Sequence, residues 1–148
     1  GSIWTSYNTD SLVSLLPLDL SFKHDKFSQS KSGVLRGVHG DHKSWKLVSC
    51  IQGEIQQVVV DMRESSATYL KWQSFDIGCS NRSLVLIPPG MGNAFYVKSS
   101  SATYHYKLAY PGNYIDADEQ FTVPWNDPRI NISWQASDPI LSNRDSEK

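Results

Sequence analysis

Residues 34–53 read VLRGVHGDHKSWKLVSCIQG and gather two histidines and several basic side chains at the start of an extended segment. Residues 45–51 (WKLVSCI) are rich in β-forming side chains, and Gly53 predicts a turn directly after them. Residues 55–62 (IQQVVVDM) are expected to continue as a strand paired with the first. The fold prediction therefore begins with strands, and basic groups lie beside a histidine able to move a proton near neutral pH.

The same pattern of short strands and turns continues along the chain. Further strands are predicted for residues 69–77, 84–87, 94–98 and 103–109, with Gly, Pro, Asn and Ser between them. Residues 11–16 (SLVSLL) favour a short helical turn that Pro17 ends. About six to eight short strands without a long helical period predict an all-β barrel or sandwich with short flanking helical turns.

Composition narrows the class of protein. At 148 residues the chain fits one domain, and its net charge of −1 argues against general binding to nucleic acid. No apolar run approaches the ~20 residues of a membrane helix, and the first residues show no signal-peptide pattern. Cys50 and Cys79 form no CxxC motif and are expected to be reduced, as in a cytoplasmic protein. The polar residues 138–148 would, in isolation, be a frayed terminus.

A metal site is not expected. A metal-binding jelly roll of the cupin type uses HxH with a nearby Glu, and a further His after a PxG turn. Here His39 and His42 are spaced as HxxH, Lys46 lies near the place of the Glu, and Asn93 stands where the second His would be. Three or four good ligands cannot be assembled from this set, and a lysine repels a divalent cation.

An acid–base site is the alternative, and it needs a carboxylate. Arg36 is suited to a phosphate group, and Lys46 adds a second fixed charge. A histidine among cations takes up a proton less readily unless an acidic partner offsets their charge, so a base at His39 needs a carboxylate from elsewhere in the chain. The competing interpretation is a strand-end histidine bonded to the backbone, and the local sequence leaves both open.

Segments along the whole chain resemble the dTDP-4-dehydrorhamnose 3,5-epimerase family of nucleotide-sugar epimerases. Residues 34–39 (VLRGVH) match its VLRGLH motif, and residues 46–48 match the KLV that follows. The remaining similar segments are residues 1–7 (GSIWTSY), 22–30 (FKHDKFSQS), 53–63 (GEIQQVVVDMR), 88–95 (PPGMGNAF), 125–134 (WNDPRINISW) and 141–145 (LSNRD). The resemblance implies a cofactor-independent, metal-free cupin jelly roll that forms a homodimer. In the family a strand and an Arg precede the segment that begins here at Gly1, so we expect that strand to be absent.

The resemblance also implies roles for particular residues. His39 would be the base that removes a proton beside a C4 ketone, and Asp145 its buried carboxylate partner. Tyr106 would return a proton from the other face, and Lys46 would stabilise the enolate oxygen. The implied substrate-binding residues are Arg36 at the diphosphate and Tyr114 in the nucleotide pocket. Four further positions are implied at which this chain differs from the family's motifs: His24, Lys26, Asn93 and Thr5.

The expected activity is inversion of C3, C5 or both in a nucleotide-diphosphate 4-keto-6-deoxy sugar, as in polysaccharide, lipopolysaccharide or capsule biosynthesis. Residues 37–41, 88–95 and 125–130 resemble a subgroup that acts on GDP-linked 4-keto-6-deoxy-heptoses, so both dTDP- and GDP-linked hexoses or heptoses are candidates. Two alternatives stay open: a 3,4-ketoisomerase on the same scaffold, and a catalytically silent nucleotide-sugar-binding module. Neither nucleic acid nor membrane is an expected partner.

Overall fold

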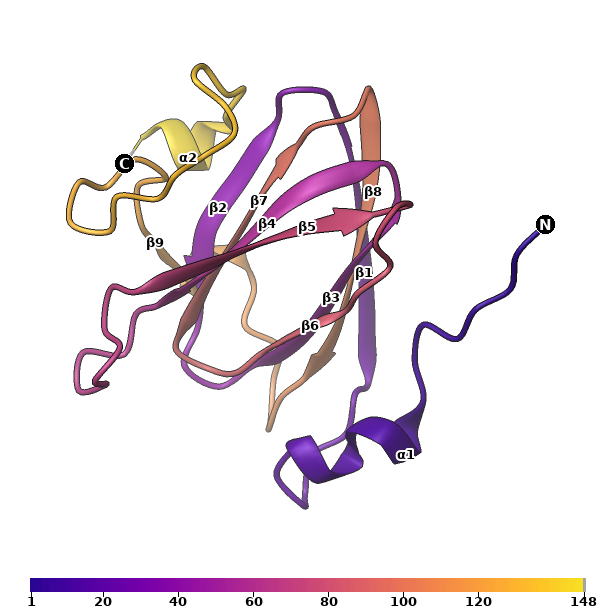
Figure 1. Ribbon diagram of the computed structural model, residues 1–148. Helices are drawn as coiled ribbons and strands as arrows, with labels where there is room; N and C mark the ends of the chain where they lie inside the picture. The colour runs from indigo at the N-terminus through magenta and orange to yellow at the C-terminus, as the bar shows by residue number, and fades with distance from the viewer. Residues whose placement is uncertain (148) are drawn as a thin grey trace.

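Two antiparallel sheets face each other in the computed structural model, which describes residues 1–147 (Figure 1). One sheet has the order β1 (His24–Lys31), β8 (Ser101–Ala109), β3 (Trp45–Gln52) and β6 (Val85–Ile87). The other has the order β5 (Trp72–Gly78), β4 (Glu54–Asp61), β7 (Met91–Val97), β2 (Leu35–Gly40) and β9 (Phe121–Thr122). The all-β jelly-roll prediction is confirmed.

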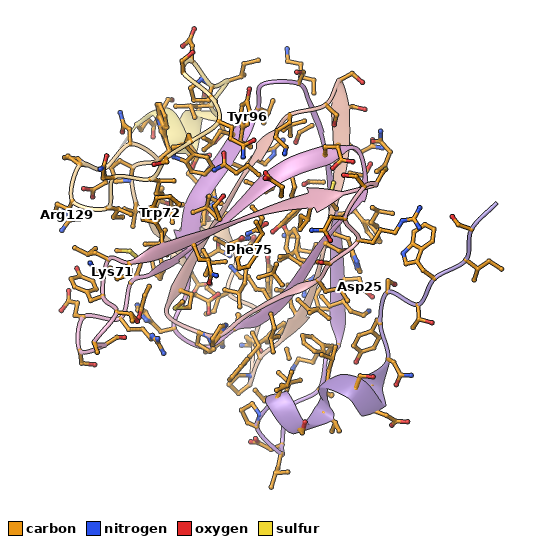
Figure 2. The ribbon with its side chains drawn as sticks, viewed as in Figure 1. Asp25, Lys71, Trp72, Phe75, Tyr96 and Arg129 are labelled. Carbon is orange, nitrogen blue, oxygen red and sulfur yellow. The ribbon has the colours of Figure 1, made fainter. Side chains whose placement is uncertain are left out.

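The core lies between the sheets and takes side chains from both. Val48 and Tyr104 from the first sheet pack with Ile55 and Phe95 from the second. The rings of Phe95 and Tyr104 stack with centroids 4.1 Å apart. Burying each such large side chain contributes roughly 1.5–3 kcal/mol, so these contacts hold the sheets together. Figure 2 shows side chains filling the space between the layers, while Asp25 projects on the side away from Arg129.

Gly53 carries the chain from one sheet to the other. The prediction that residues 55–62 pair with residues 45–51 is wrong, because β3 pairs with β6 and β8 whereas β4 pairs with β5 and β7. Gly53 has φ +88°, and a Cβ at this position would lie 2.1 Å from the Ser101 carbonyl oxygen. The glycine thus turns the chain across the edge of the sandwich rather than within one sheet.

Two other segments differ from the sequence prediction. Residues 69–71 form a turn, with Leu70 at φ +67°, and the strand begins only at Trp72. Strand β1 was not predicted, because its inward-facing side chains are polar: Lys26, Ser28 and Ser30 alternate with more exposed neighbours, among them Phe27. A strand with its polar face inward does not show the usual alternation of a half-buried strand.

Short helices lie at the margins. The helical turn predicted for residues 11–16 is confirmed as α1 (Thr9–Leu12) followed by the 3₁₀ turn η1 (Val13–Leu15), and a second 3₁₀ turn, η2, spans Ala117–Glu119. The remaining helix is α2 (Asn143–Ser146), at the opposite end of the molecule from α1 (Figure 1). Among residues 1–147, no helix is long and apolar enough to cross a membrane. Cys50 and Cys79 are both free thiols, as expected.

The C-terminal segment is ordered against the sandwich instead of fraying. Leu35 N–H donates to the Ile140 carbonyl at 2.9 Å, and Ile140 N–H donates to the Gly33 carbonyl at 2.8 Å. Ser142 then caps α2, and these contacts direct residues 142–145 toward β2. Lys148, the end of the segment expected to be frayed, lies outside the described residues.

Candidate active site

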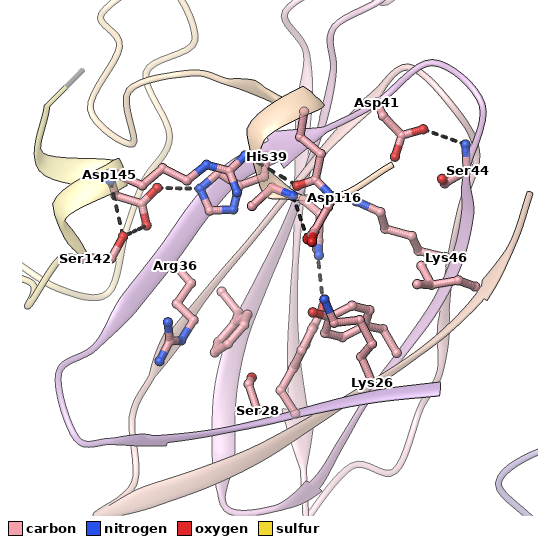
Figure 3. A pocket seen from close by; sticks show the side chains of 18 of the residues that line it. Lys26, Ser28, Arg36, His39, Asp41, Ser44, Lys46, Asp116, Ser142 and Asp145 are labelled. Atoms are coloured by element: carbon pink, nitrogen blue, oxygen red, sulfur yellow. Dashed lines mark hydrogen bonds and ion pairs between the residues drawn. The ribbon is translucent and has the colours of Figure 1, made fainter. Parts of the chain in front are cut away.

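A cavity of about 250 Å³ is lined by residues of both sheets, by residues 114–120 and by the C-terminal turn (Figure 3). Its wall includes eight of the ten side chains that the sequence singled out. These eight are Lys26, Arg36, His39, Lys46, Asn93, Tyr106, Tyr114 and Asp145. The sandwich therefore brings together residues that are spread over 120 positions of the sequence, from 26 to 145.

His39 and Asp145 form the central contact of the cavity. His39 Nε2 lies 2.5 Å from Asp145 Oδ1, across a sequence separation of 106 residues. Because an ionised carboxylate only accepts hydrogen bonds, Nε2 carries the proton and Nδ1 is left as the nitrogen that can take one. The imidazole side chain is 20% exposed, so it lies at the cavity surface with its carboxylate partner buried behind it.

Asp145 is ionised despite its burial. Burial alone raises the pKa of its carboxyl, but the hydrogen bond and charge of His39 outweigh this, with help from the Gly37 N–H at 3.2 Å and the Ser142 hydroxyl at 3.0 Å. The net result is a pKa below the ordinary value. A Cβ on Gly37 would lie 2.6 Å from the Ala94 Cβ, so only glycine lets β2 approach β7 closely here.

Lys46 is a buried cation on the opposite wall. The residue is 8% exposed, and burial lowers the pKa of its ammonium, while the nearby charge of Asp41 acts in the opposite direction. Arg144 and Lys26 lower the pKa further by like charge. A buried ammonium facing a cavity is a strong site for an oxygen that carries or develops negative charge.

Tyr106 and Tyr114 share the cation of Lys26. Lys26 Nζ donates to the Tyr114 hydroxyl at 2.8 Å and lies 5.9 Å from the centroid of the Tyr106 ring. Burial raises the pKa of Tyr106, and the charge of Lys26 partly offsets that rise. The neighbouring His105 points to the other face of β8, where it contacts Asp25 at 2.8 Å.

Arg36 and Asn93 are held by internal hydrogen bonds. Arg36 Nε donates to Ser30 Oγ at 3.0 Å, which fixes the guanidinium at the cavity wall. Asn93 Oδ1 accepts from Gln57 Nε2 at 2.5 Å and from the Tyr104 hydroxyl at 3.3 Å. Asn93 therefore belongs to a buried amide–phenol network. Among residues 1–147, no three His, Cys, Asp or Glu side chains are grouped as metal ligands.

The structure does not bring Thr5 or His24 to the cavity. Thr5 is exposed in the N-terminal segment, at the end of the molecule away from α2 (Figure 1). His24 lies behind Tyr114, with ring centroids 4.7 Å apart, and its Nδ1 is 3.1 Å from the Tyr110 hydroxyl. Its position in β1 directs the ring to the aromatic cluster beside the cavity. His24 would therefore affect a ligand only indirectly, by positioning Tyr114.

The cavity also contains polar residues that sequence reasoning missed. Arg144 lies on its wall, where its Nε donates to Thr122 Oγ1 at 2.9 Å, and adjacency to Asp145 in LSNRD was a usable signal. Asp41 and Ser44 also line it, from the loop between β2 and β3. The spacing DHKS, with an Asp three residues before a Ser, indicates a side-chain-capped turn. It gives no sign that the turn faces a ligand cavity.

Comparisons with known proteins agree with this architecture. The family model described as dTDP-4-dehydrorhamnose 3,5-epimerase matches residues 1–148. The chain is 35% identical over 149 residues to the dTDP-4-dehydrorhamnose 3,5-epimerase of Escherichia coli K12, covering 98% of this chain and 79% of that protein. It is 32% identical over 144 residues to a dTDP-4-dehydrorhamnose 3-epimerase of Streptomyces niveus, covering 95% and 68%.

A solved structure gives the same result in three dimensions. The crystal structure of dTDP-6-deoxy-D-glucose-3,5-epimerase from Legionella pneumophila, in complex with dTDP-4-keto-L-rhamnose, matches with a TM-score of 0.88 at 32% identity. The match covers 98% of this chain and 77% of that one. The cupin-like fold and the sequence resemblance are both confirmed, and the chain belongs to the dTDP-4-dehydrorhamnose 3,5-epimerase family of isomerases.

Proposed function

We propose that the protein inverts C3, C5 or both in a nucleotide-diphosphate 4-keto-6-deoxy sugar. The observation that carries the proposal is the hydrogen-bonded pair of His39 and Asp145 in one cavity with the buried Lys46. A base with a fixed tautomer and a cation for an oxygen are the two groups that proton removal beside a ketone requires. No cofactor is needed, because the ketone accepts the electron pair.

In the first step, His39 Nδ1 takes the proton from the carbon next to the carbonyl. The C–H electron pair forms a carbon–carbon double bond, and the carbonyl pair moves to the oxygen, giving an enolate. Asp145 stabilises the imidazolium through Nε2 and keeps the ring in its reactive orientation. Lys46 stabilises the enolate oxygen, a type of contact whose removal typically costs about 10²–10³ in rate.

In the second step, Tyr106 delivers its phenolic proton to the opposite face of the same carbon. The electron pair of the carbon–carbon double bond forms the new C–H bond, and an electron pair of the enolate oxygen re-forms the carbonyl. The configuration of the carbon is thereby inverted. Lys26, close to the Tyr106 ring, stabilises the phenolate that remains until solvent returns a proton. A positioned acid of this kind contributes about 10²–10⁴ in rate.

The nucleotide diphosphate binds beside these groups. Arg36 contacts the diphosphate, because a guanidinium matches phosphate oxygens in pairs. Lys26, Asn93 and Tyr114 complete the substrate pocket. The relatives are named for dTDP-linked sugars. We include GDP-linked hexoses and heptoses because the sequences of residues 37–41, 88–95 and 125–130 resemble the subgroup that acts on GDP-linked heptoses.

We further propose a homodimer in the cytoplasm. The outer face of the β1–β8–β3–β6 sheet carries exposed apolar side chains, with Phe27 at 61% and Ile51 at 44% exposure. Clustered apolar surface of this kind is typical of a subunit interface. Two free thiols, Cys50 and Cys79, are consistent with a reducing compartment.

Proton exchange with solvent is the direct test. The protein is incubated in D₂O with dTDP-4-keto-6-deoxyglucose and, separately, with GDP-4-keto-6-deoxymannose, and NMR follows deuterium at C3 and C5. Exchange that is lost in His39→Ala and kept in His42→Ala supports the proposal, because His42 is exposed and outside the cavity. Binding without exchange would identify a silent module instead, and a carbonyl that moves to C3 would identify a ketoisomerase.

A further inference from the structure

Two buried polar atoms of residues that line the cavity have no hydrogen-bond partner among residues 1–147: Asp41 Oδ2 and Ser44 Oγ. Asp41 is 6% exposed and Ser44 is 3% exposed. A buried polar atom left without a partner costs about 1–3 kcal/mol, and more when it is charged. Because native proteins carry few such atoms, two together on one cavity wall indicate a surface built to receive donors from a ligand.

The Asp41 carboxylate is fixed in orientation by its own loop. Its Oδ1 accepts the backbone N–H of Lys43 at 2.9 Å and that of Ser44 at 2.7 Å. Figure 3 shows the bond to Ser44. The main-chain carbonyl of Asp41 accepts the Gly90 N–H at 2.8 Å, which ties the loop to the start of β7. One oxygen is therefore used to hold the loop, and the other is held in a fixed orientation, so that little rotational freedom is lost when it gains a partner.

The chemistry of the two atoms restricts what they can bind. An ionised carboxylate oxygen only accepts, so Asp41 Oδ2 requires a donor, while a serine hydroxyl can both donate and accept. The charge of Asp41 acts on the ammonium of Lys46, which places the two groups in the same part of the cavity. A ketone oxygen suits Lys46 and has no proton for Asp41, whereas a hydroxyl close to that ketone can donate the hydrogen bond that Asp41 Oδ2 requires.

We propose that Asp41 and Ser44 form a hydroxyl clamp that binds the C3 hydroxyl of the sugar while Lys46 binds the adjacent C4 carbonyl. This inference rests on the proposed function for the identity of the sugar. The clamp fixes the ring against His39 and makes the cavity specific for sugars that keep a hydroxyl beside the carbonyl. Asp41 is thus a substrate-contact residue that determines specificity.

Asp41→Asn separates the clamp from the loop. The asparagine Oδ1 still accepts both backbone N–H groups, so its NH₂ must occupy the position of Oδ2 and can no longer accept from a hydroxyl. The probes are dTDP-4-keto-6-deoxyglucose and its 3-deoxy analogue, together with the GDP-linked pair, and calorimetry measures the Kd of each. The wild-type protein should prefer the 3-hydroxy sugar by about 10- to 100-fold.

In Asp41→Asn at least half of that preference should be lost on a logarithmic scale, with the Kd of the 3-deoxy analogue unchanged. Ser44→Ala should lose about half of the preference on a logarithmic scale, and this variant leaves the loop's hydrogen bonds intact. Asp127→Asn is the matched control: Asp127 is a buried carboxylate that caps its own turn outside the cavity, accepting the Arg129 N–H at 2.9 Å. Its preference should equal that of the wild type.

The outcomes distinguish the clamp from the epimerase activity. Wild-type protein that binds both members of each pair equally, or binds none of them, overturns the clamp. So does an undiminished preference in both Asp41→Asn and Ser44→Ala. Selective binding without deuterium exchange overturns the proposed function and keeps the clamp, whereas exchange without selectivity does the reverse.

Discussion

The Nε2 atom of His39 lies 2.5 Å from Oδ1 of Asp145, so a hydrogen bond joins a strand in the first third of the chain to a helix 106 residues later. Asp145 is itself fixed by the Gly37 N–H and the Ser142 hydroxyl, which are donors from both segments. The position of the imidazole proton is thus determined by tertiary structure rather than by the local sequence around His39.

Asp145→Asn should keep the fold and lose most of the activity. The amide can present its NH₂ to Nε2, which would place the proton on Nδ1 and remove the base. In the serine-protease triad, which the same change leaves intact in geometry, the loss in kcat is ≈ 10⁴, and we expect about 10³–10⁴ here. Steady-state kinetics and the melting temperature measure the two effects. Activity within tenfold of the wild type would contradict the role of Asp145.

Lys46→Met should lower the catalytic activity and raise the free energy of unfolding. Burial of the ammonium costs free energy that a methionine of similar length does not, so we expect unfolding to become harder, by about 1 kcal/mol or a few degrees in Tm. At the same time kcat should fall by about 10²–10³, because the enolate oxygen loses its cation. Calorimetry and exchange kinetics test the two halves separately, and a less stable variant would show that Lys46 serves the fold.

The alkaline side of the pH profile should report Lys46. Burial lowers the pKa of the Lys46 ammonium below the ordinary value of 10.5. The cation is lost as pH rises through this lowered pKa, so the alkaline decrease in kcat should occur at a lower pH than an ordinary lysine would give. Lys46→Arg is the control, since a guanidinium stays charged throughout this range. In that variant the alkaline fall should vanish even if the rate is lower overall; an identical fall in both proteins would assign it to another group.

Tyr106→Phe should uncouple exchange from inversion. His39 can still remove and return a proton on its own face, so deuterium should continue to enter the substrate. Delivery to the opposite face should fall by about 10²–10⁴. NMR measures deuterium content and product epimer in one sample. Tyr96→Phe is the matched control, because Tyr96 lies on β7 and is not part of the cavity wall. Equal losses of exchange and inversion in Tyr106→Phe would contradict a two-face mechanism.

Asp61→Ala should destabilise the sandwich without changing the site. Asp61 is 2% exposed and accepts from Arg63, Ser66 and Thr68, which fold the connection between β4 and β5. We expect the free energy of unfolding to fall by about 2–3 kcal/mol. Urea denaturation measures the change, and Arg63→Ala should cost far less because that side chain is 46% exposed, against 2% for Asp61.

The acid dependence of stability should follow from the same cluster. The Arg63 guanidinium, together with the hydroxyls of Ser66 and Thr68, holds the pKa of Asp61 well below its usual range. A depressed carboxyl pKa contributes stability that is complete above the unfolded value, near 3.8, and is lost as pH falls through the folded value. Asp61→Ala should therefore lose less stability than the wild type between pH 4 and pH 2, as about 1.4 kcal/mol accompanies each pKa unit.

Sequence reasoning predicted most strands because β3, β4, β6 and β8 carry ordinary β-forming side chains. It missed β1, whose inward side chains are polar because they line the cavity. The pairing of β3 and β4 was also mispredicted, since a turn glycine alone does not distinguish a hairpin from a crossing between sheets.

The site was predictable where a motif fixed the residue type, and less so where position depends on distant contacts. Local patterning describes Asp145 as part of a polar tail, and only the LSNRD resemblance paired it with His39. The same resemblance assigned Thr5 and His24 to the substrate, yet neither lines the cavity. Asp41 was not identified from the sequence, because an unpaired oxygen can be recognised only once its surroundings are known.

The helix that carries Asp145 has only four residues, too few to be stable by itself in water. It is held by its bonds to β2 and by Arg144, which donates to Thr122 and Gln120. Opening this turn breaks far fewer contacts than separating the two sheets. Heat should therefore inactivate the enzyme below the temperature at which the sandwich melts, and cooling should restore it without refolding. The contacts that hold this one short helix, rather than the stability of the core, should therefore set the highest temperature at which the enzyme works.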